Sequence, residues 1–287
     1  MPHLPSRRQL VQAAALLTAT VLLAACGKKE APPAAAAPAA APAAAAAAKV
    51  YVVGTDAAYA PFESQNEKGE IVGFDIDVVK AAAAKAGIAV KFVNTPWEGI
   101  FNALGQGDRD MVVSAVTITD ERKQTMDFST PYFDAQQLIA VKNSSKITGF
   151  AALKNLKVGV QTGTTGDEAV SKLQGKTSTN IKRFESTPLA LKELEAGGVD
   201  AVVADNGVVI NYVANNPGGK FKSIADKEFV PEQYGIALKK GNAELQAKLN
   251  KGLADIKADG SYDKIYTQYF GAPPAAAAAA PAPAASK

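Results

Sequence analysis

The chain is poor in the residues from which metal centres and nucleophilic active sites are usually built. Its 287 residues include one cysteine and one histidine. Zinc sites made of clustered cysteine and histidine, Cys–His dyads, Ser–His–Asp triads and intramolecular disulfides are therefore excluded. We expect no metal ion and no cofactor.

An excess of charge of either sign is also missing. The sequence has 31 lysines and arginines against 28 aspartates and glutamates, which gives a formal net charge of +3. This balance provides no electrostatic reason to expect a nucleic acid partner or a polybasic membrane contact. Hydrophobic residues make up 47% of the chain. At this length, that proportion is enough for one or two buried cores.

Residues 1–25 have the pattern of a secretory signal peptide. Arg7 and Arg8 provide a positive start, residues 10–23 are apolar, and small residues follow. The segment is too short and wrongly flanked for a stable transmembrane span. It leads into Leu-Ala-Ala-Cys, which resembles a bacterial lipobox whose cysteine, here Cys26, carries the lipid of the mature protein. A chance cysteine after an apolar run is the alternative.

The same segment indicates by which route the protein is exported and where the mature protein is located. The sequence around Arg7 and Arg8 also resembles a twin-arginine export signal, although the ordinary secretory route is the preferred interpretation. The only histidine, His3, lies in the segment that would be removed, so the mature chain would contain none. We expect a periplasmic protein that is anchored by lipid to a bacterial membrane.

Alanine and proline dominate residues 27–48, and the same composition returns in residues 272–287. Prolines every few residues break any alanine-rich helix, and nothing in these segments can build a core. We interpret residues 26–48 as a lipidated cysteine with its tether and residues 272–287 as a disordered tail. Such a tether would leave the folded body free to reach a membrane partner.

The residues between these segments alternate between apolar, β-branched runs and amphipathic runs. Strands that alternate with helices form right-handed βαβ units, so the pattern predicts an α/β fold with largely parallel sheets. The expected strands are residues 49–55, 89–94, 110–116, 137–142, 157–161, 181–184, 201–204 and 235–238. The expected helices are residues 73–86, 97–104, a helix that follows 162–167 and ends near 173, 187–196, 243–259 and 262–270.

The most informative stretch is residues 114–122, at the end of the third expected strand. It places Thr117, Thr119 and Arg122 where a strand stops and a helical turn begins. A guanidinium presents paired donors that match a carboxylate, and threonine hydroxyls both donate and accept. The cluster suits a small zwitterion. The alternative is that Thr119 is a helix N-cap and Arg122 a solvated surface charge.

This stretch, followed by Met-Asp-Phe-Ser-Thr-Pro-Tyr at 126–132, resembles the signature of bacterial periplasmic solute-binding proteins, family 3, which bind polar amino acids. The resemblance extends over residues 49–271. It implies a two-lobed, type II binding-protein fold, with two parallel-rich sheets joined by a two-strand hinge. The implied boundaries are 49–131 and 235–271 for lobe 1, 137–229 for lobe 2, and 132–136 and 230–234 for the hinge.

The resemblance also implies which residues bind the two ends of an amino acid, its α-carboxylate and its α-ammonium. Arg122 would bind the α-carboxylate, aided by backbone N–H groups of Thr164 and Thr165 at a helix start. Asp205, the Thr117 hydroxyl and the Ser114 carbonyl would bind the α-ammonium. Taken alone, residues 163–166 could be a plain turn, and Asp205 a cap or turn residue. The full ligand-binding set implied is Asp56, Tyr59, Asp75, Trp97, Ser114, Ala115, Thr117, Arg122, Gln161, Thr164, Thr165 and Asp205.

Side-chain specificity is implied by four of these residues. Tyr59 and Trp97 match aromatic walls of the family, and Asp56 and Asp75 match positions near the distal end of the ligand. Two carboxylates beside two aromatic rings favour a cationic side chain. The segments 158–166 and 202–206 are most similar to the arginine, lysine and histidine binders. A glutamine-specific binder stays possible, as do Asp75 as a helix cap and Trp97 as a core residue.

The resemblance implies a receptor that works by lobe closure around an amino acid. Its expected partner is a membrane ABC permease with its ATPases, and the receptor is expected to be a monomer that binds no nucleic acid. An enzyme of the same fold, dehydratase-like, is the alternative from another class, because Asp56 and Asp75 could form an acid–base pair. A surface sensor that binds an amino acid without transporting it is a third possibility.

Overall fold

The computed structural model describes residues 49–271 of the chain. The expected signal peptide, the lipidation site at Cys26, the tether and the tail all lie outside the described residues. No helix within residues 49–271 is long and apolar enough to cross a membrane.

The first sheet has five strands in the order β5-β1-β6-β15-β7. Strand β1 (Val50–Thr55) pairs in parallel with β5 (Ala89–Asn94) and β6 (Met111–Val112). Strand β15 (Ala237–Lys239) returns from near the end of the described residues and inserts antiparallel between β6 and β7 (Met126–Phe128). The first sheet is therefore built from two distant parts of the sequence.

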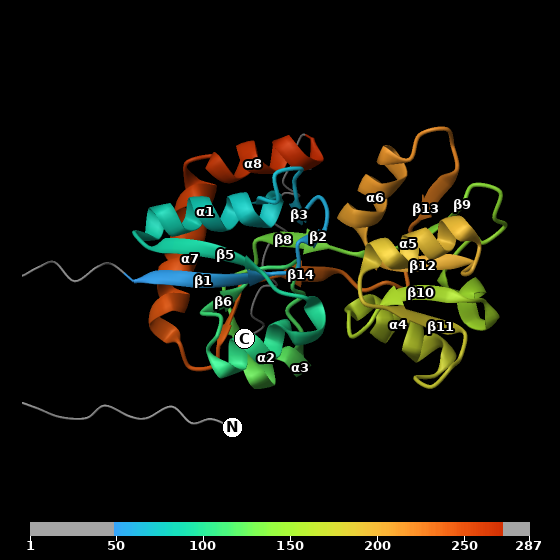
Figure 1. Ribbon diagram of the computed structural model, residues 1–287, viewed down its shortest axis with the longest axis horizontal. Coiled ribbons are helices and arrows are strands. Elements are labelled where there is room, and N and C mark those ends of the chain that lie inside the picture. Colours follow the sequence, from blue (N-terminus) through green and yellow to red (C-terminus); the bar gives the residue numbers. More distant parts are fainter. Residues whose placement is uncertain (1–48, 272–287) are drawn as a thin grey trace, which may run out of the picture. The chain divides into compact units, whose positions relative to one another are not determined.

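Five helices accompany this sheet, and we call the whole assembly lobe 1. In Figure 1, α1 and α8 lie above β1 and β5, whereas α2 and α3 lie below. A small antiparallel sheet of β2 (Ala58–Tyr59), β3 (Glu63–Gln65) and β4 (Ile71–Val72) belongs to the same lobe. The helices are α1 (Phe74–Ala86), α2 (Trp97–Gln106), α3 (Asp120–Thr125), α7 (Ala243–Ala258) and α8 (Ser261–Phe270).

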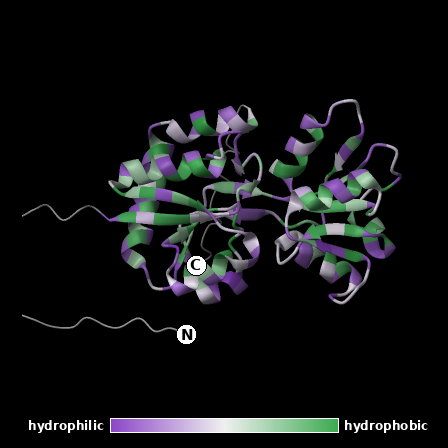
Figure 2. Cartoon of the chain, viewed as in Figure 1, coloured by the Kyte–Doolittle hydropathy of each residue, from purple (hydrophilic) through white to green (hydrophobic). Residues whose placement is uncertain are grey.

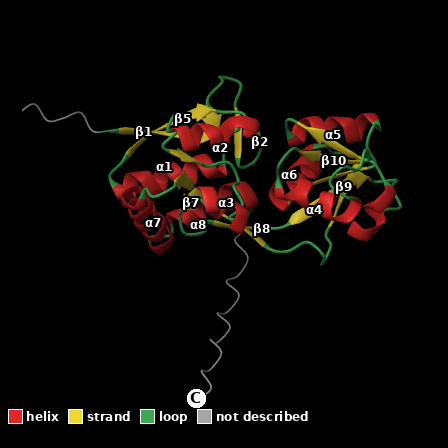
Figure 3. Cartoon of the chain, turned by 90° about the horizontal axis from the view of Figure 1, so that it is seen from below, coloured by secondary structure: helices red, strands yellow, loops and turns green. Residues whose placement is uncertain are grey.

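The second sheet also has five strands, in the order β11-β10-β12-β9-β13. With its helices it forms lobe 2, and Figure 3 shows the alternation of helix and strand in both lobes. The strands are β9 (Gln137–Lys142), β10 (Val158–Gln161), β11 (Ile181–Phe184), β12 (Ala201–Asp205) and β13 (Phe221–Ile224). The helices are η1 (Phe150–Asn155), α4 (Thr165–Gln174), α5 (Thr187–Ala196) and α6 (Asn206–Asn215).

Two short strands connect the lobes. Strand β8 (Phe133–Ala135) leads from lobe 1 to lobe 2, and β14 (Glu232–Tyr234) leads back. They pair antiparallel, with Phe133 opposite Tyr234. These strands fall inside the two segments expected to form the hinge.

Each lobe has a buried apolar core, and Val208 of α6 in lobe 2 packs with the core of lobe 1; Figure 2 shows hydrophobic residues along the strands. The core of lobe 1 is rich in aromatic rings. Phe62 and Phe74 are fully buried, and the Phe62 ring packs edge-to-face on Phe133 at 5.0 Å and on Tyr234 at 5.3 Å. Hinge strands and lobe core are thus packed together.

Several boundaries follow from backbone requirements. Helix α1 begins after Gly73, whose φ is 139°, and a Cβ there would lie 2.1 Å from the Phe62 carbonyl oxygen. It ends at Gly87 with φ 66°, as the sequence predicts. The strand expected at 110–116 is only Met111–Val112, because the chain turns at Ala115, where φ is 45°. That turn carries the chain into the functional site.

The two-lobed α/β fold is confirmed, and both sheets are mixed. Each combines parallel pairings around β1 or β10 with antiparallel pairings to β15 or β9. The sequence pattern had predicted parallel-rich sheets without separating these antiparallel strands. Helix α6 and strands β7 and β13 were not predicted.

Candidate functional site

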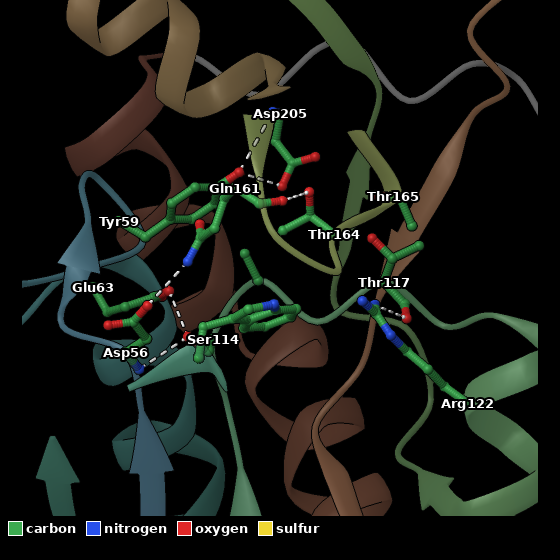
Figure 4. Close-up of a pocket in the computed structure, with 12 residues that line it drawn as sticks. Asp56, Tyr59, Glu63, Ser114, Thr117, Arg122, Gln161, Thr164, Thr165 and Asp205 are labelled. Carbon is green, nitrogen blue, oxygen red and sulfur yellow. Dashed lines mark hydrogen bonds between the residues drawn. The ribbon is translucent and has the colours of Figure 1, made fainter. Parts of the chain in front are cut away.

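A pocket lies where the two lobes face each other, at the ends of strands from both sheets (Figure 4). Strand β1 and the turn after β6 contribute from lobe 1, whereas β10, β12 and the start of α4 contribute from lobe 2. The lining residues are Asp56, Tyr59, Glu63, Trp97, Ser114, Ala115, Thr117, Arg122, Gln161, Thr164, Thr165 and Asp205. All of these except Glu63 belong to the set expected from the sequence.

Arg122 is held in place by its own helical turn. Thr119 is the N-cap of α3, and its hydroxyl accepts a hydrogen bond from the Arg122 backbone N–H at 3.1 Å. The guanidinium donates to the Thr117 carbonyl at 2.9 Å and lies 5.3 Å from the ring centres of Trp97 and Phe101. Thr119 is thus an N-cap, as the alternative interpretation predicted, and the same turn places Arg122 at the pocket; its binding of a carboxylate stays a prediction.

Asp205 faces the pocket from lobe 2. It ends β12 and occupies the N-cap position of α6, but its side chain makes no cap hydrogen bond. Its carboxylate instead accepts from the Tyr59 hydroxyl at 2.7 Å and from the Gln137 amide. Burial, with the nearby charge of Glu232, raises the pKa of Asp205 to about 6. At neutral pH the group is therefore predominantly an anionic acceptor.

The lobe 1 end of the pocket is acidic. Ser114 donates its hydroxyl hydrogen to Glu63 at 2.9 Å and accepts from the Asp56 backbone N–H at 3.0 Å. Glu63 is fully buried, and its second carboxylate oxygen, Oε2, has no hydrogen-bond partner among the described residues. Burial and the charge of Asp75 raise the pKa of Glu63 well above its usual value. The protonated form is therefore favoured when no cation is near, and a cationic group beside Oε2 would favour the carboxylate.

Asp75 does not line the pocket, and the expectation that it faces the ligand is therefore not met. It lies in the first turn of α1, fully buried, where its Oδ2 accepts from the Ala115 backbone N–H at 2.7 Å and the Tyr132 hydroxyl at 2.7 Å. Burial raises the pKa of Asp75 to about 7. Its side chain supports the turn at Ala115 from behind, and Glu63 takes the position at the pocket surface.

Glu63 was not among the predicted site residues. Glu63 follows a buried phenylalanine and begins β3, a three-residue strand in the small sheet that was not predicted. Between the strand predicted at 49–55 and the helix predicted at 73–86, the sequence pattern predicts no element, so nothing in it singles out Glu63. The side chain becomes recognisable only when β3 is placed beside the turn at Ser114.

The lobe 2 wall is built from the end of β10 and the start of α4. Gln161 donates to the Asp56 carboxylate at 3.2 Å, a contact between the lobes. Thr164 is the N-cap of α4, and its hydroxyl accepts from the Asp167 backbone N–H at 3.2 Å. The first N–H groups of a helix lack intrahelical partners and favour anions. The cap interpretation of residues 163–166 therefore agrees with a site for a carboxylate.

The free space among the lining residues is about 20 Å³. A cavity of this size holds about one water molecule, far less than an amino acid. The lobes are held against each other by the Tyr59–Asp205 and Gln161–Asp56 hydrogen bonds. A ligand can therefore enter only when these contacts open. No group of three or more histidine, cysteine or acidic residues arranged for a metal ion occurs in residues 49–271.

Comparison with known proteins identifies relatives of one kind, namely binding proteins for small solutes. The family of bacterial extracellular solute-binding proteins, family 3, matches residues 51–272. A probable histidine-binding protein of Neisseria gonorrhoeae is 47% identical over 223 residues, which cover 77% of this chain and 83% of the relative.

Two solved structures are similar in both fold and sequence. The arginine-, lysine-, histidine-binding protein ArtJ from Geobacillus stearothermophilus has a TM-score of 0.76 and 46% identity, covering 79% of this chain and 97% of ArtJ. An ancestral arginine-binding protein bound to glutamine has a TM-score of 0.73 and 45% identity. The match covers 77% of this chain and 98% of the ancestral protein. The chain belongs to the bacterial extracellular solute-binding proteins, family 3.

Proposed function

We propose that this protein binds a basic amino acid, arginine, lysine or histidine, between its two lobes and delivers it to a membrane ABC permease. The observation that supports this most strongly is the arrangement of charge in the pocket. Arg122 faces it from one lobe, Asp205 from the other, and a group of acidic side chains lies at the lobe 1 end.

The two ends of an amino acid fit the two charged walls. Among residues 49–271, Arg122 is the only cation that lines the pocket. A guanidinium binds a carboxylate through two parallel hydrogen bonds, and the start of α4 adds backbone N–H groups near Thr165. Asp205 accepts from the ammonium at the opposite wall. The zwitterion thus bridges the lobes.

The acidic end favours a positively charged side chain. Asp56 and Glu63 lie there, and Ser114 and Gln161 hold them in place. With Asp205, three carboxyl groups face one guanidinium. A ligand with a second positive charge balances this excess, and the indole of Trp97 offers a face for it. The names of the similar proteins, histidine-binding and arginine-, lysine-, histidine-binding, agree with this preference.

Glutamine is the second candidate ligand. Its side-chain amide could donate to Asp56 or Glu63 and accept from Gln161, whose own amide already reaches Asp56 at 3.2 Å. One of the similar structures is an arginine-binding protein bound to glutamine. The two ligands differ in charge, so binding measurements separate them.

Transport would follow from closure. A ligand that contacts both lobes stabilises the closed arrangement by its differential affinity for that arrangement. In our proposal a permease recognises this form, and lipid at Cys26 anchors the receptor to a bacterial membrane. Replacing Cys26 with serine should release the protein from the membrane fraction without changing its affinity for the ligand.

The function is tested by titrating the soluble protein, residues 27–287, with amino acids. Bound ligand is first removed by unfolding and refolding. Calorimetry with arginine, lysine, histidine and glutamine should give the tightest binding to a basic amino acid. Glutamine alone would support the second candidate, and no binding to any common amino acid would contradict the proposal. A ligand that binds only the folded protein also raises the melting temperature.

A further inference from the structure

Glu232 lies in hinge strand β14, outside the set of residues that line the pocket. It is half-buried behind two threonines that do line it. The Thr117 hydroxyl donates to Glu232 Oε2 at 2.6 Å, and the Thr165 hydroxyl donates to the same oxygen at 2.9 Å. One hinge carboxylate oxygen thus collects a hydroxyl hydrogen from each lobe.

These two bonds fix what the threonines can offer a ligand. A hydroxyl has one hydrogen to donate and two lone pairs that accept. Thr117 and Thr165 both use their hydrogen on Glu232. Towards the pocket, their hydroxyl oxygens can then only accept, and Thr165 has one lone pair left for this because it also accepts from the Gln137 amide at 3.2 Å. Such oxygens attract an ammonium group and have nothing to donate to a carboxylate or a hydroxyl oxygen.

A third contact links Glu232 to Asp205, the acidic residue of lobe 2 that lines the pocket. The Gln137 amide donates to Glu232 Oε1 at 3.1 Å and also donates to Asp205. The same amide also lies within donating distance of the Thr165 hydroxyl oxygen, at 3.2 Å, so Gln137 shares its N–H groups among two carboxylates and this hydroxyl. Asp205, Thr117 and Thr165 together form a wall of acceptors, which Glu232 and Gln137 orient from behind.

The contacts also depend on the position of the lobes. Thr117 belongs to lobe 1 and Thr165 to lobe 2, and they are separated from Glu232 by 115 and 67 positions in the sequence. They meet at one oxygen only when the lobes are together. The acceptor wall is thus assembled by closure, at the moment when the ligand is enclosed.

We propose that Glu232 is a positioning residue that makes the closed pocket select ligands with an α-ammonium group. This inference rests on the proposed function, since it concerns recognition of the amino group of the same ligand. It assigns Glu232 no contact with the ligand. Its action is to hold the hydroxyl hydrogens of two threonines away from the pocket.

The test compares two ligands in two proteins. L-arginine and 5-guanidinopentanoate differ only in the α-amino group, and both are titrated into the wild type and into Glu232→Gln. The wild type should prefer arginine strongly. In Glu232→Gln, the amide cannot accept from both threonines and from Gln137, so the ratio of the two dissociation constants should fall at least ~5-fold, about 1 kcal/mol.

Controls separate this role from a merely structural one. Loss of hinge stability would weaken both ligands by the same factor and leave the ratio unchanged, and that result would overturn the inference. Glu228→Gln removes an exposed charge four residues before Glu232, at the end of lobe 2, and should leave the ratio as in the wild type. Thr165→Val removes one of the two hydroxyls without altering the carboxylate, and it should lower the ratio part of the way.

The inference and the proposed function fail differently in this experiment. A wild type that binds arginine, together with an unchanged ratio in both Glu232→Gln and Thr165→Val, would overturn only the role of Glu232. A wild type that binds no amino acid would overturn the proposed function, and this inference with it.

Discussion

The Tyr59 hydroxyl donates to the Asp205 carboxylate at 2.7 Å, across 146 positions of the sequence. Tyr59 lies in lobe 1 and Asp205 in lobe 2, so the bond exists only when the lobes are together. A ligand ammonium that binds Asp205 would share this acceptor with Tyr59. The residue that we propose to bind one end of the ligand thus also holds the lobes together.

Removing either of the two charged side chains that face each other across the pocket should abolish detectable binding of the amino acid. Arg122→Ala leaves the ligand carboxylate without its cation, and Asp205→Ala leaves the ammonium without its anion. Loss of one partner of an enclosed charge pair costs roughly 3–5 kcal/mol, which corresponds to at least ~100-fold in affinity. Calorimetry with arginine measures the effect.

Lys123→Ala is the matched control for Arg122→Ala, because Lys123 is the exposed neighbour on the same helix and pairs only with Asp120 within the described chain. Its affinity for arginine should equal that of the wild type. Near-normal arginine affinity in Arg122→Ala or Asp205→Ala would mean that the ligand is bound elsewhere.

Glu63→Gln should change specificity more than total affinity for amino acids. Burial favours the protonated form of Glu63, and a cation beside it would favour the carboxylate; the substitution removes this ionisable group but keeps an oxygen that can accept from Ser114. Arginine should lose ~10-fold or more, whereas glutamine should change by less than ~3-fold, because only the cation depends on that charge. Equal losses for the two ligands would show that Glu63 is structural.

The stability of the ligand-free protein should fall as pH rises from about 4 to 7 through the contribution of Asp75. Its pKa is raised to about 7 by burial, so the folded state holds the proton more tightly than the unfolded chain does. Stability from this proton is complete below the unfolded value of about 4 and is lost as pH passes the folded value.

Asp75→Asn isolates that contribution. The difference in unfolding free energy between variant and wild type should shift by a few kcal/mol, on the order of the full linkage, in favour of the variant between pH 4.5 and pH 8. Urea denaturation at both pH values gives the number. A difference that does not depend on pH would show that Asp75 is ionised in the folded protein over this whole range, as it is in the unfolded chain.

Gly207→Ala should weaken ligand binding without contacting the ligand. A Cβ at position 207, in the first turn of α6, would lie 2.6 Å from Cζ of Phe62 in lobe 1. Helical backbone accepts alanine, and alanine favours a helix by about 1 kcal/mol over glycine. The separated lobes should therefore be as stable as before, while closure meets a clash, and the affinity for arginine should fall ~10-fold.

Gly99→Ala is the corresponding control, since a Cβ at that helical position meets nothing within 4 Å. The double variant Gly207→Ala with Phe62→Leu should recover part of the lost affinity, because the smaller side chain withdraws from the clash. If Gly207→Ala binds arginine as tightly as the wild type, the two lobes do not approach this closely in the bound form.

The sequence predicted the pocket-lining residues that lie at the end of a strand or in the turn and helix that follow it. Arg122 and Asp205 each follow an apolar, β-branched run, and parallel strands place their carboxyl ends together. Asp75 and Glu63 were harder to separate, because choosing between them requires the left-handed turn at Ala115 that gives Asp75 its backbone partner. No local pattern encodes that choice.

Glu232 could not be found from the sequence for a related reason. Its three partners lie 67, 95 and 115 positions away, and two of them belong to different lobes. The segment around it was expected only to be a connection. Its role depends on contacts that distant segments make when the lobes close. Hydrophobic periodicity indicates local structure only and does not predict such contacts.

The insertion of β15 between β6 and β7 has a consequence for how the chain folds during synthesis. Until residues 237–239 are made, β6 and β7 have no strand between them, and their unpaired edges are exposed. The strands of lobe 2 lie within residues 137–224 and need no later segment. We expect lobe 2 to fold first, with its amide hydrogens protected in pulse-labelled nascent chains while those of β6 still exchange.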